Sequence, residues 1–217
     1  MATFCGVRQA LTMPAGRLCQ WPIGHVLRWN VVRSVPGFSR TECQQIYSAA
    51  FDKFSTVSAF QHRFVSQARD ANILCGARAI DGGSGILAEA ELPCGSITEN
   101  TQLRMWIDES DRWTASTDDW QSTGRFPLPT VALHEFGHSI GLSHDEDGQK
   151  NAIMDPSISN LSELQDADVR EIVLRYGEDE DNGEGEKPED DIVEMLIRCL
   201  GRLSKDDRES LRSFLSG

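Results

Sequence analysis

The stretch TVALHEFGHSIGLSHD constrains this chain most, because three of its five histidines fall within eleven residues there. His134 and His138 are four residues apart, so a helix would place both rings on one face. Two imidazoles at this spacing supply two ligands of a tetrahedral zinc site. Gly141 lets the backbone leave the helix in a left-handed conformation, which can bring His144 to the same metal. Glu135, beside the first ligand, would then act on a water at the open fourth position.

The composition narrows the class of protein. A length of 217 residues and an apolar content of 39% suit one domain with appendages. No run of about 18 apolar residues predicts a membrane span, so no membrane partner is expected. The net charge of −13 disfavours nucleic-acid binding through phosphate contacts. The amino terminus lacks the unbroken apolar core of a secretory signal, which leaves a cytoplasmic protein or a chain shown without its leader as alternatives.

We expect four segments. Residues 1–20 form an irregular tail, and 21–177 form the main domain. In 178–191 nine of fourteen residues are acidic and one is basic, so this segment carries −8 of the total charge and is expected to be a solvated linker. Apolar residues at helical spacing in 192–217 predict two short helices, which would dock on the main domain, on each other or on a partner.

The main domain has the pattern of a mixed α+β fold, with strands preceding helices. Ser39 and Glu42 form a capping box that predicts a helix to about residue 54. Thr130 is a plausible N-cap of the motif helix, and an amphipathic pattern predicts a last helix that Gly177 ends. The expected strands lie at 25–35, 62–66, 71–78, 86–92 and 101–108, and the last helix at 161–177.

The six cysteines show no CxxC pair and no dense framework. They could be free thiols in a reducing compartment, or one or two disulfides could form among them. We expect Cys43, Cys75 and Cys199 to be small buried residues.

After the motif comes the run Ala-Ile-Met-Asp-Pro with Met154 at its centre, and together they resemble the metzincins, in particular the matrixins (the matrix metalloproteinase catalytic domain). The resemblance covers 21–177: Trp21 and His25 keep the W-x-x-x-H spacing, and ILAEAELP is similar to the edge strand that pairs with bound peptide. It implies a zincin-like, twisted five-stranded sheet with one antiparallel edge strand and three helices, followed here by a C-terminal helical appendage. It also implies that Met154 forms a hydrophobic floor under the zinc.

The function implied by the resemblance is a zinc-dependent metalloendopeptidase acting on protein or peptide substrates. Glu135 would be the general base, peptide would lie antiparallel to residues 86–90, and the side chain after the scissile bond would enter a pocket near 156–158. A non-catalytic zinc-bearing binding module is the alternative, which the retention of Glu135 disfavours. Hydrolysis of a non-peptide amide is a third alternative.

The resemblance also bears on further metal sites. Asp81, Asp108 and Asp111 fall where the family places calcium carboxylates, and hard oxygen ligands on a glycine loop suit calcium. A solvated loop with scattered acids is the alternative. A second, structural zinc is not expected, because Glu89 and Trp106 occupy two positions where the family has histidines.

Cys5-Gly6-Val7 is similar to the propeptide run whose cysteine blocks the zinc in latent matrixins. Phe4 and Arg8-Gln9 replace residues of that run, so the ion pair that secures it is missing. The hypothesis is that Cys5 reversibly lowers activity; the alternative is a tail with a bystander thiol. The resemblance favours an extracellular location, whereas the missing leader favours a cytoplasmic one.

Overall fold

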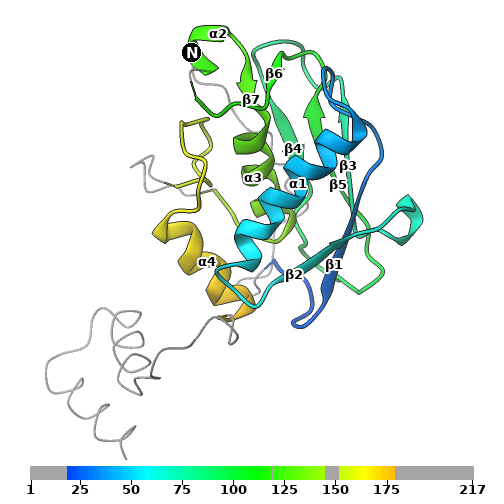
Figure 1. The fold of residues 1–217 in the computed structure, drawn as a ribbon. Helices are drawn as coiled ribbons and strands as arrows, with labels where there is room; N and C mark the ends of the chain where they lie inside the picture. The colour runs from blue at the N-terminus through cyan, green and yellow to red at the C-terminus, as the bar shows by residue number, and fades with distance from the viewer. Residues whose placement is uncertain (1–18, 119, 145–151, 179–217) are drawn as a thin grey trace, which may run out of the picture. The chain divides into compact units, whose positions relative to one another are not determined.

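A computed structural model of the chain describes residues 19–118, 120–144 and 152–178 (Figure 1). The expected linker beyond Glu178, the expected C-terminal helices and the tail with Cys5 lie outside these residues, as does Cys199. The boundaries of those segments therefore stay predictions. Within the described part no helix is long and apolar enough to cross a membrane.

A five-stranded mixed sheet carries the domain, with the strand order β2-β1-β3-β5-β4. Neighbouring strands are parallel except for β4, which runs antiparallel to β5 at the sheet edge. This confirms the expected sheet with one antiparallel edge strand. The strands are β1 (Val26–Val31), β2 (Gln61–Phe64), β3 (Ile73–Arg78), β4 (Ala88–Ala90) and β5 (Leu103–Asp108).

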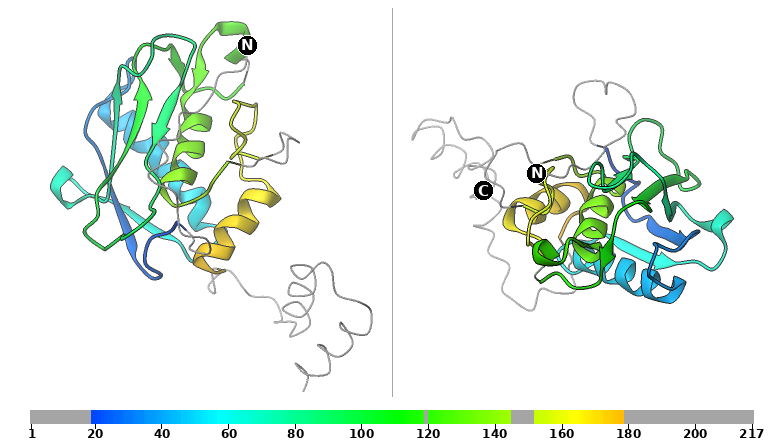
Figure 2. Two further views of the ribbon diagram at one scale, coloured as in Figure 1. Left: turned by 180° about the vertical axis from the view of Figure 1, so that it is seen from behind. Right: turned by 90° about the horizontal axis from the view of Figure 1, so that it is seen from above.

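The helices α1 (Arg40–Ser55) and α3 (Leu128–Ser139) pack together over one face of the sheet (Figure 2). Alternate residues of the central strand β3 are buried there, including Cys75, while the other set points to the opposite face. The Phe51 ring of α1 stacks on Phe136 of α3 with centroids 3.8 Å apart, and Tyr47 meets the same ring edge-on. This aromatic contact joins α1 to α3 over the sheet.

Local side chains predicted the start of α1 correctly and the start of α3 incorrectly. Ser39 and Glu42 form the expected capping box of α1. The prediction of Thr130 as N-cap of α3 was wrong, because the helix already begins at Leu128. Pro129 fits that first turn, where no intrahelical partner for its missing N–H is needed. The Thr130 hydroxyl instead donates to the carbonyl of Leu161, 3.1 Å away.

The last helix, α4 (Asp166–Tyr176), ends before Gly177 as expected but begins later than the predicted residue 161. The Asp168 carboxylate accepts from the Gln165 amide at 2.8 Å, which fixes the start of the helix. Four short elements were not predicted: the 3-10 helix η1 (Ala68–Asp70), β6 (Trp113–Thr114), α2 (Trp120–Thr123) and β7 (Phe126–Pro127).

Candidate metal centre and active site

Helix α3 brings His134 and His138 together inside the domain. Both residues are buried, and their Nε2 atoms lie 3.0 Å apart. The Nδ1 of His134 is 2.7 Å from the carbonyl of Ile153, and the Nδ1 of His138 is 2.8 Å from that of Leu142. A carbonyl can only accept, so both Nδ1 atoms carry the proton. In the neutral rings each Nε2 atom therefore carries a lone pair, and the two lone pairs face one another.

The two rings are held neutral. Burial lowers the pKa of the His134 imidazole to about 4, and burial also lowers the pKa of His138 well below its ordinary value. Two facing lone pairs repel one another unless a cation lies near both, and neutral imidazole is the form that binds zinc. The residues present thus fit a zinc ion, and the bonds at Nδ1 supply the outer contacts that orient metal-binding histidines.

His144 completes the group. Its ring lies 5.3 Å from that of His134 and 4.7 Å from that of His138, centroid to centroid. Each ring offers one nitrogen as a ligand atom, and these three nitrogens all lie within 4.8 Å of one another. The structure therefore brings together all three histidines that the sequence motif nominated as ligands.

Gly141 makes the turn between His138 and His144. Its φ is +106°, and its amide donates to His138 O while the Leu142 amide donates to Gly137 O. This pair of bonds is the Schellman arrangement that ends many helices. A Cβ atom at position 141 would overlap the carbonyl oxygen of Cys19, so glycine is required here both by conformation and by space.

Met154 lies buried under α3, against Gly137. The turn that carries it is held by Asp168 of α4, whose two carboxylate oxygens accept from the amides of Ile153 and Met154 at 2.9 and 3.1 Å. Asp168 was not singled out in the sequence, because an acid in the first turn of a helix is ordinarily explained by capping alone.

Glu135 is buried next to His134 and lines a pocket beside it. The pocket runs between α3 and the loop after Met154, and it also includes Leu87, just before the edge strand β4. It lies at the 156–158 loop, where the sequence placed a pocket for a substrate side chain. The remaining lining residues are Thr130, Val131, Ile153, Asp155, Pro156, Ser157, Ile158 and Ser159.

Asp81, Asp108 and Asp111 lie around the glycine loop that precedes β4. Amides of this region bind them: Ser84 N donates to Asp111 Oδ1 at 2.8 Å, and Ile86 N donates to Asp81 at 3.0 Å. Burial raises the pKa of Asp111, and the neighbouring charges of Asp108 and Asp81 raise it further against the Ser84 hydrogen bond. The other oxygen of Asp111, Oδ2, is buried with no hydrogen-bond partner among the described residues.

Glu89 and Trp106 lie on the face of the sheet away from α1 and α3. Glu89 forms an ion pair with Arg78, and the Arg78 guanidinium lies 5.8 Å from the centre of the Trp106 ring. Trp106 also covers Gly76, where a Cβ atom would come within 2.7 Å of the indole. These two positions are therefore engaged in a packed ion pair and ring contact.

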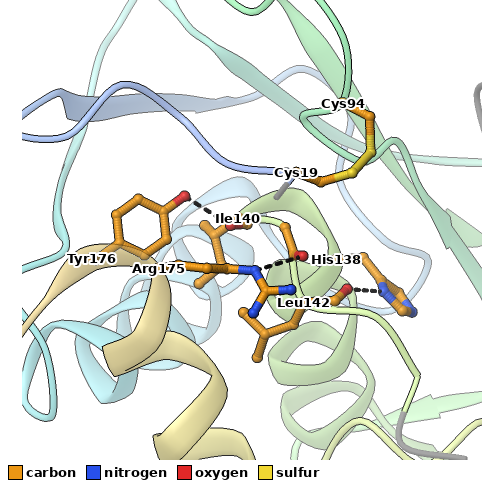
Figure 3. Close-up of a disulfide and its surroundings, with 8 residues drawn as sticks. Cys19, Cys94, His138, Ile140, Leu142, Arg175 and Tyr176 are labelled. Atoms are coloured by element: carbon orange, nitrogen blue, oxygen red, sulfur yellow. Dashed lines mark hydrogen bonds between the residues drawn. A yellow bond between two sulfur atoms is a disulfide. The ribbon is translucent and has the colours of Figure 1, made fainter. Parts of the chain in front are cut away.

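Two cysteines that the sequence left open form a disulfide. Cys19 pairs with Cys94, which follows the edge strand β4 (Figure 3). Cys43 and Cys75 are buried free thiols, as expected, and burial raises the pKa of both. Pairing between positions 75 residues apart leaves no local sequence signal.

Comparison with known proteins agrees with this geometry. The family model of the matrixins matches residues 20–177, and the chain belongs to that family. Among its relatives are the human neutrophil collagenase (31% identical over 163 residues, 70% of this chain and 32% of the relative), the rabbit macrophage metalloelastase (30% over 176 residues, 76% and 35%) and the pig interstitial collagenase (28% over 205 residues, 90% and 40%). The chain thus spans about a third to two fifths of the length of these relatives.

Proposed function

We propose that residues 21–177 form a zinc-dependent metalloendopeptidase that hydrolyses internal bonds of proteins or peptides. The observation that carries the proposal is the group of three histidine nitrogens within 4.8 Å of one another, with the Glu135 carboxylate in the adjoining pocket. Membership of the matrixin family supports the same class of activity. His134, His138 and His144 would hold one zinc ion.

A zinc ion held there would supply Lewis acidity, lowering the pKa of a water toward about 7 and polarising the scissile carbonyl. Glu135 takes the proton of the attacking water as general base and then passes it to the nitrogen of the leaving amine. Its burial beside the pocket keeps bulk water from competing for that proton. Met154 shapes the floor under the histidines without binding the metal.

Substrate would bind as an added strand. Among the residues that the structure describes, β4 pairs only with β5, so its other edge can pair with an extended peptide running antiparallel to residues 86–90. Leu87 lines the pocket that also contains Glu135, so a peptide on this edge passes the metal centre. The side chain after the scissile bond would enter the pocket near Ile158, to which Leu87 and Val131 also contribute apolar surface.

We also propose a calcium ion at Asp81, Asp108 and Asp111. The unpartnered, buried Oδ2 of Asp111 and the mutual effect of the three charges support it. Their oxygens are not gathered as closely as the three histidine nitrogens, so backbone carbonyls of the glycine loop would have to complete the site. Calcium titration of the unfolding temperature tests this: an increase is expected, and Asp111→Asn should remove it.

The compartment of the protein is proposed from its disulfide. The Cys19–Cys94 disulfide supports an extracellular or other oxidising location, because such bonds persist there and are rare in the cytosol.

The test is incubation of the zinc-loaded full chain with an unstructured protein, with and without a zinc chelator. We expect internal cleavage that the chelator abolishes and added zinc restores. If one zinc is bound per chain and no cleavage occurs, the result would instead favour a non-catalytic zinc-bearing binding module. Hydrolysis of small amides but not of the protein would favour the non-peptide alternative.

A further inference from the structure

The turn that ends α3 is held by four side chains, three of which lie outside the metal site. Four consecutive carbonyls, from Ser139 to Leu142, each accept a hydrogen bond from a side chain. The donors are Trp21 Nε1 to Ser139 at 2.9 Å, Tyr176 Oη to Ile140 at 2.7 Å, Arg175 Nε to Gly141 at 3.0 Å and His138 Nδ1 to Leu142 at 2.8 Å. Carbonyls beyond the end of a helix have no partner within it and are commonly left to water.

Two of these donors come from the last turn of α4 (Figure 3). Arg175 and Tyr176 are both buried, and each points at the turn after α3. The Tyr176 hydroxyl also accepts from the backbone amide of Trp21 at 3.2 Å, so it joins the chain entering the domain to the turn. A buried guanidinium on a carbonyl makes a charge-assisted bond, which is stronger than a neutral one.

The turn determines two of the three candidate ligands. Its last carbonyl, Leu142 O, accepts from His138 Nδ1 and so sets the orientation and tautomer of that ring. His144 follows two residues later, so a displacement of the turn moves its ring as well. The carbonyls bound by Arg175 and Tyr176 directly precede Leu142, and the two side chains therefore act on both histidines through the backbone.

We propose that Arg175 and Tyr176 are positioning residues for the metal centre, acting through the carbonyls of Gly141 and Ile140. The proposal deepens the proposed function, because it rests on a metal being held by the three histidines. It does not require that the metal centre be catalytic.

The test is the zinc dissociation constant of the full chain, measured without substrate by competition with a chromophoric chelator. Arg175→Met removes the donors and keeps the aliphatic stem, while Tyr176→Phe removes only the hydroxyl. Loss of such outer contacts weakens metal binding by about 10–100-fold, and we expect at least the lower value for each variant. Cobalt-substituted protein should show a changed visible absorption spectrum in both variants, because the ligand geometry shifts.

Matched controls come from the same helix. Arg170→Met removes an exposed positive charge five residues before Arg175, and Glu171→Gln removes the ion-pair partner of Arg175 without touching the bond to Gly141. Both should keep zinc affinity within about twofold of the wild type. Arg175→Lys should recover part of the affinity lost in Arg175→Met, since it restores a charged donor.

The outcomes separate this proposal from the proposed function. If Tyr176→Phe, and Arg175→Met where it folds, lower the unfolding temperature but leave zinc affinity and the cobalt spectrum unchanged, the residues are only structural and the proposal is overturned. If the wild type binds zinc but cleaves nothing, the peptidase proposal fails while the affinity comparison still decides the role of Arg175 and Tyr176.

Discussion

Gly137 and Met154 are in direct contact: a Cβ atom on Gly137 would overlap the sulfur of Met154. Gly137 directly precedes His138 on α3. Met154 directly follows Ile153, whose carbonyl accepts a hydrogen bond from His134. The methionine therefore packs against the helix between its two candidate ligands. A substitution at either residue would change the spacing of those ligands.

Gly137→Ala should lower the free energy of unfolding by about 1–3 kcal/mol, the usual cost of overpacking a buried contact. The measurement is urea unfolding. In a Met154→Ala background the same substitution should cost clearly less, because the sulfur that it would meet is gone. An equal cost in both backgrounds would show that the two residues are not coupled.

The Cys19–Cys94 disulfide should contribute substantially to stability. Chain entropy for a separation of 75 residues gives about 4.5 kcal/mol, and losses of about 2–4 kcal/mol are typical. We expect the Cys19→Ser/Cys94→Ser double variant to unfold at lower urea, with a loss in this range. Dithiothreitol should shift the wild type toward the variant and leave the variant unchanged. A wild type indifferent to reductant would contradict the pairing.

Stability of the zinc-free protein should fall as the pH drops from 7 to 5. Burial lowers the pKa of His62, His134 and His138 in the folded chain, whereas in the unfolded chain they titrate near 6.5. Between these values the unfolded state binds more protons, so the stability present above about pH 6.5 is progressively lost below it. Each group contributes at most about 1.4 kcal/mol per pH unit.

Urea unfolding at pH 7 and pH 5 checks this expectation. The difference should shrink in a His134→Gln/His138→Gln variant, which keeps only the contribution of His62. Equal or greater stability at pH 5 in the zinc-free wild type would show that these rings are not held neutral by the fold.

Features encoded over a few residues were predictable from the sequence. The Ser39–Glu42 capping box and the positive φ of Gly141 arise from backbone requirements that one or two side chains satisfy. The approach of His134, His138 and His144 follows from helical spacing and one turn. The position of β4 as an antiparallel edge strand was expected from the family resemblance rather than from any residue pattern.

Contacts between distant segments were not predictable. Asp168 resembles an ordinary first-turn acid, yet its oxygens hold the Met154 turn. Arg175 has the pattern of an exposed basic residue at a helix end, yet it is buried against Gly141. Thr130 has good capping chemistry, but the chain enters the helix earlier and the hydroxyl finds Leu161 instead. In each case tertiary packing overrides a local preference.

The central claim is that Glu135 performs the proton transfer at a metal centre held by three histidines. The most direct measurement is kcat/KM for protein cleavage by Glu135→Ala, with zinc content determined on the same sample. We predict a loss of at least about 10²–10⁴-fold with one zinc still bound per chain, because the base is removed and the ligands remain. Undiminished activity in a zinc-loaded Glu135→Ala variant would contradict the account.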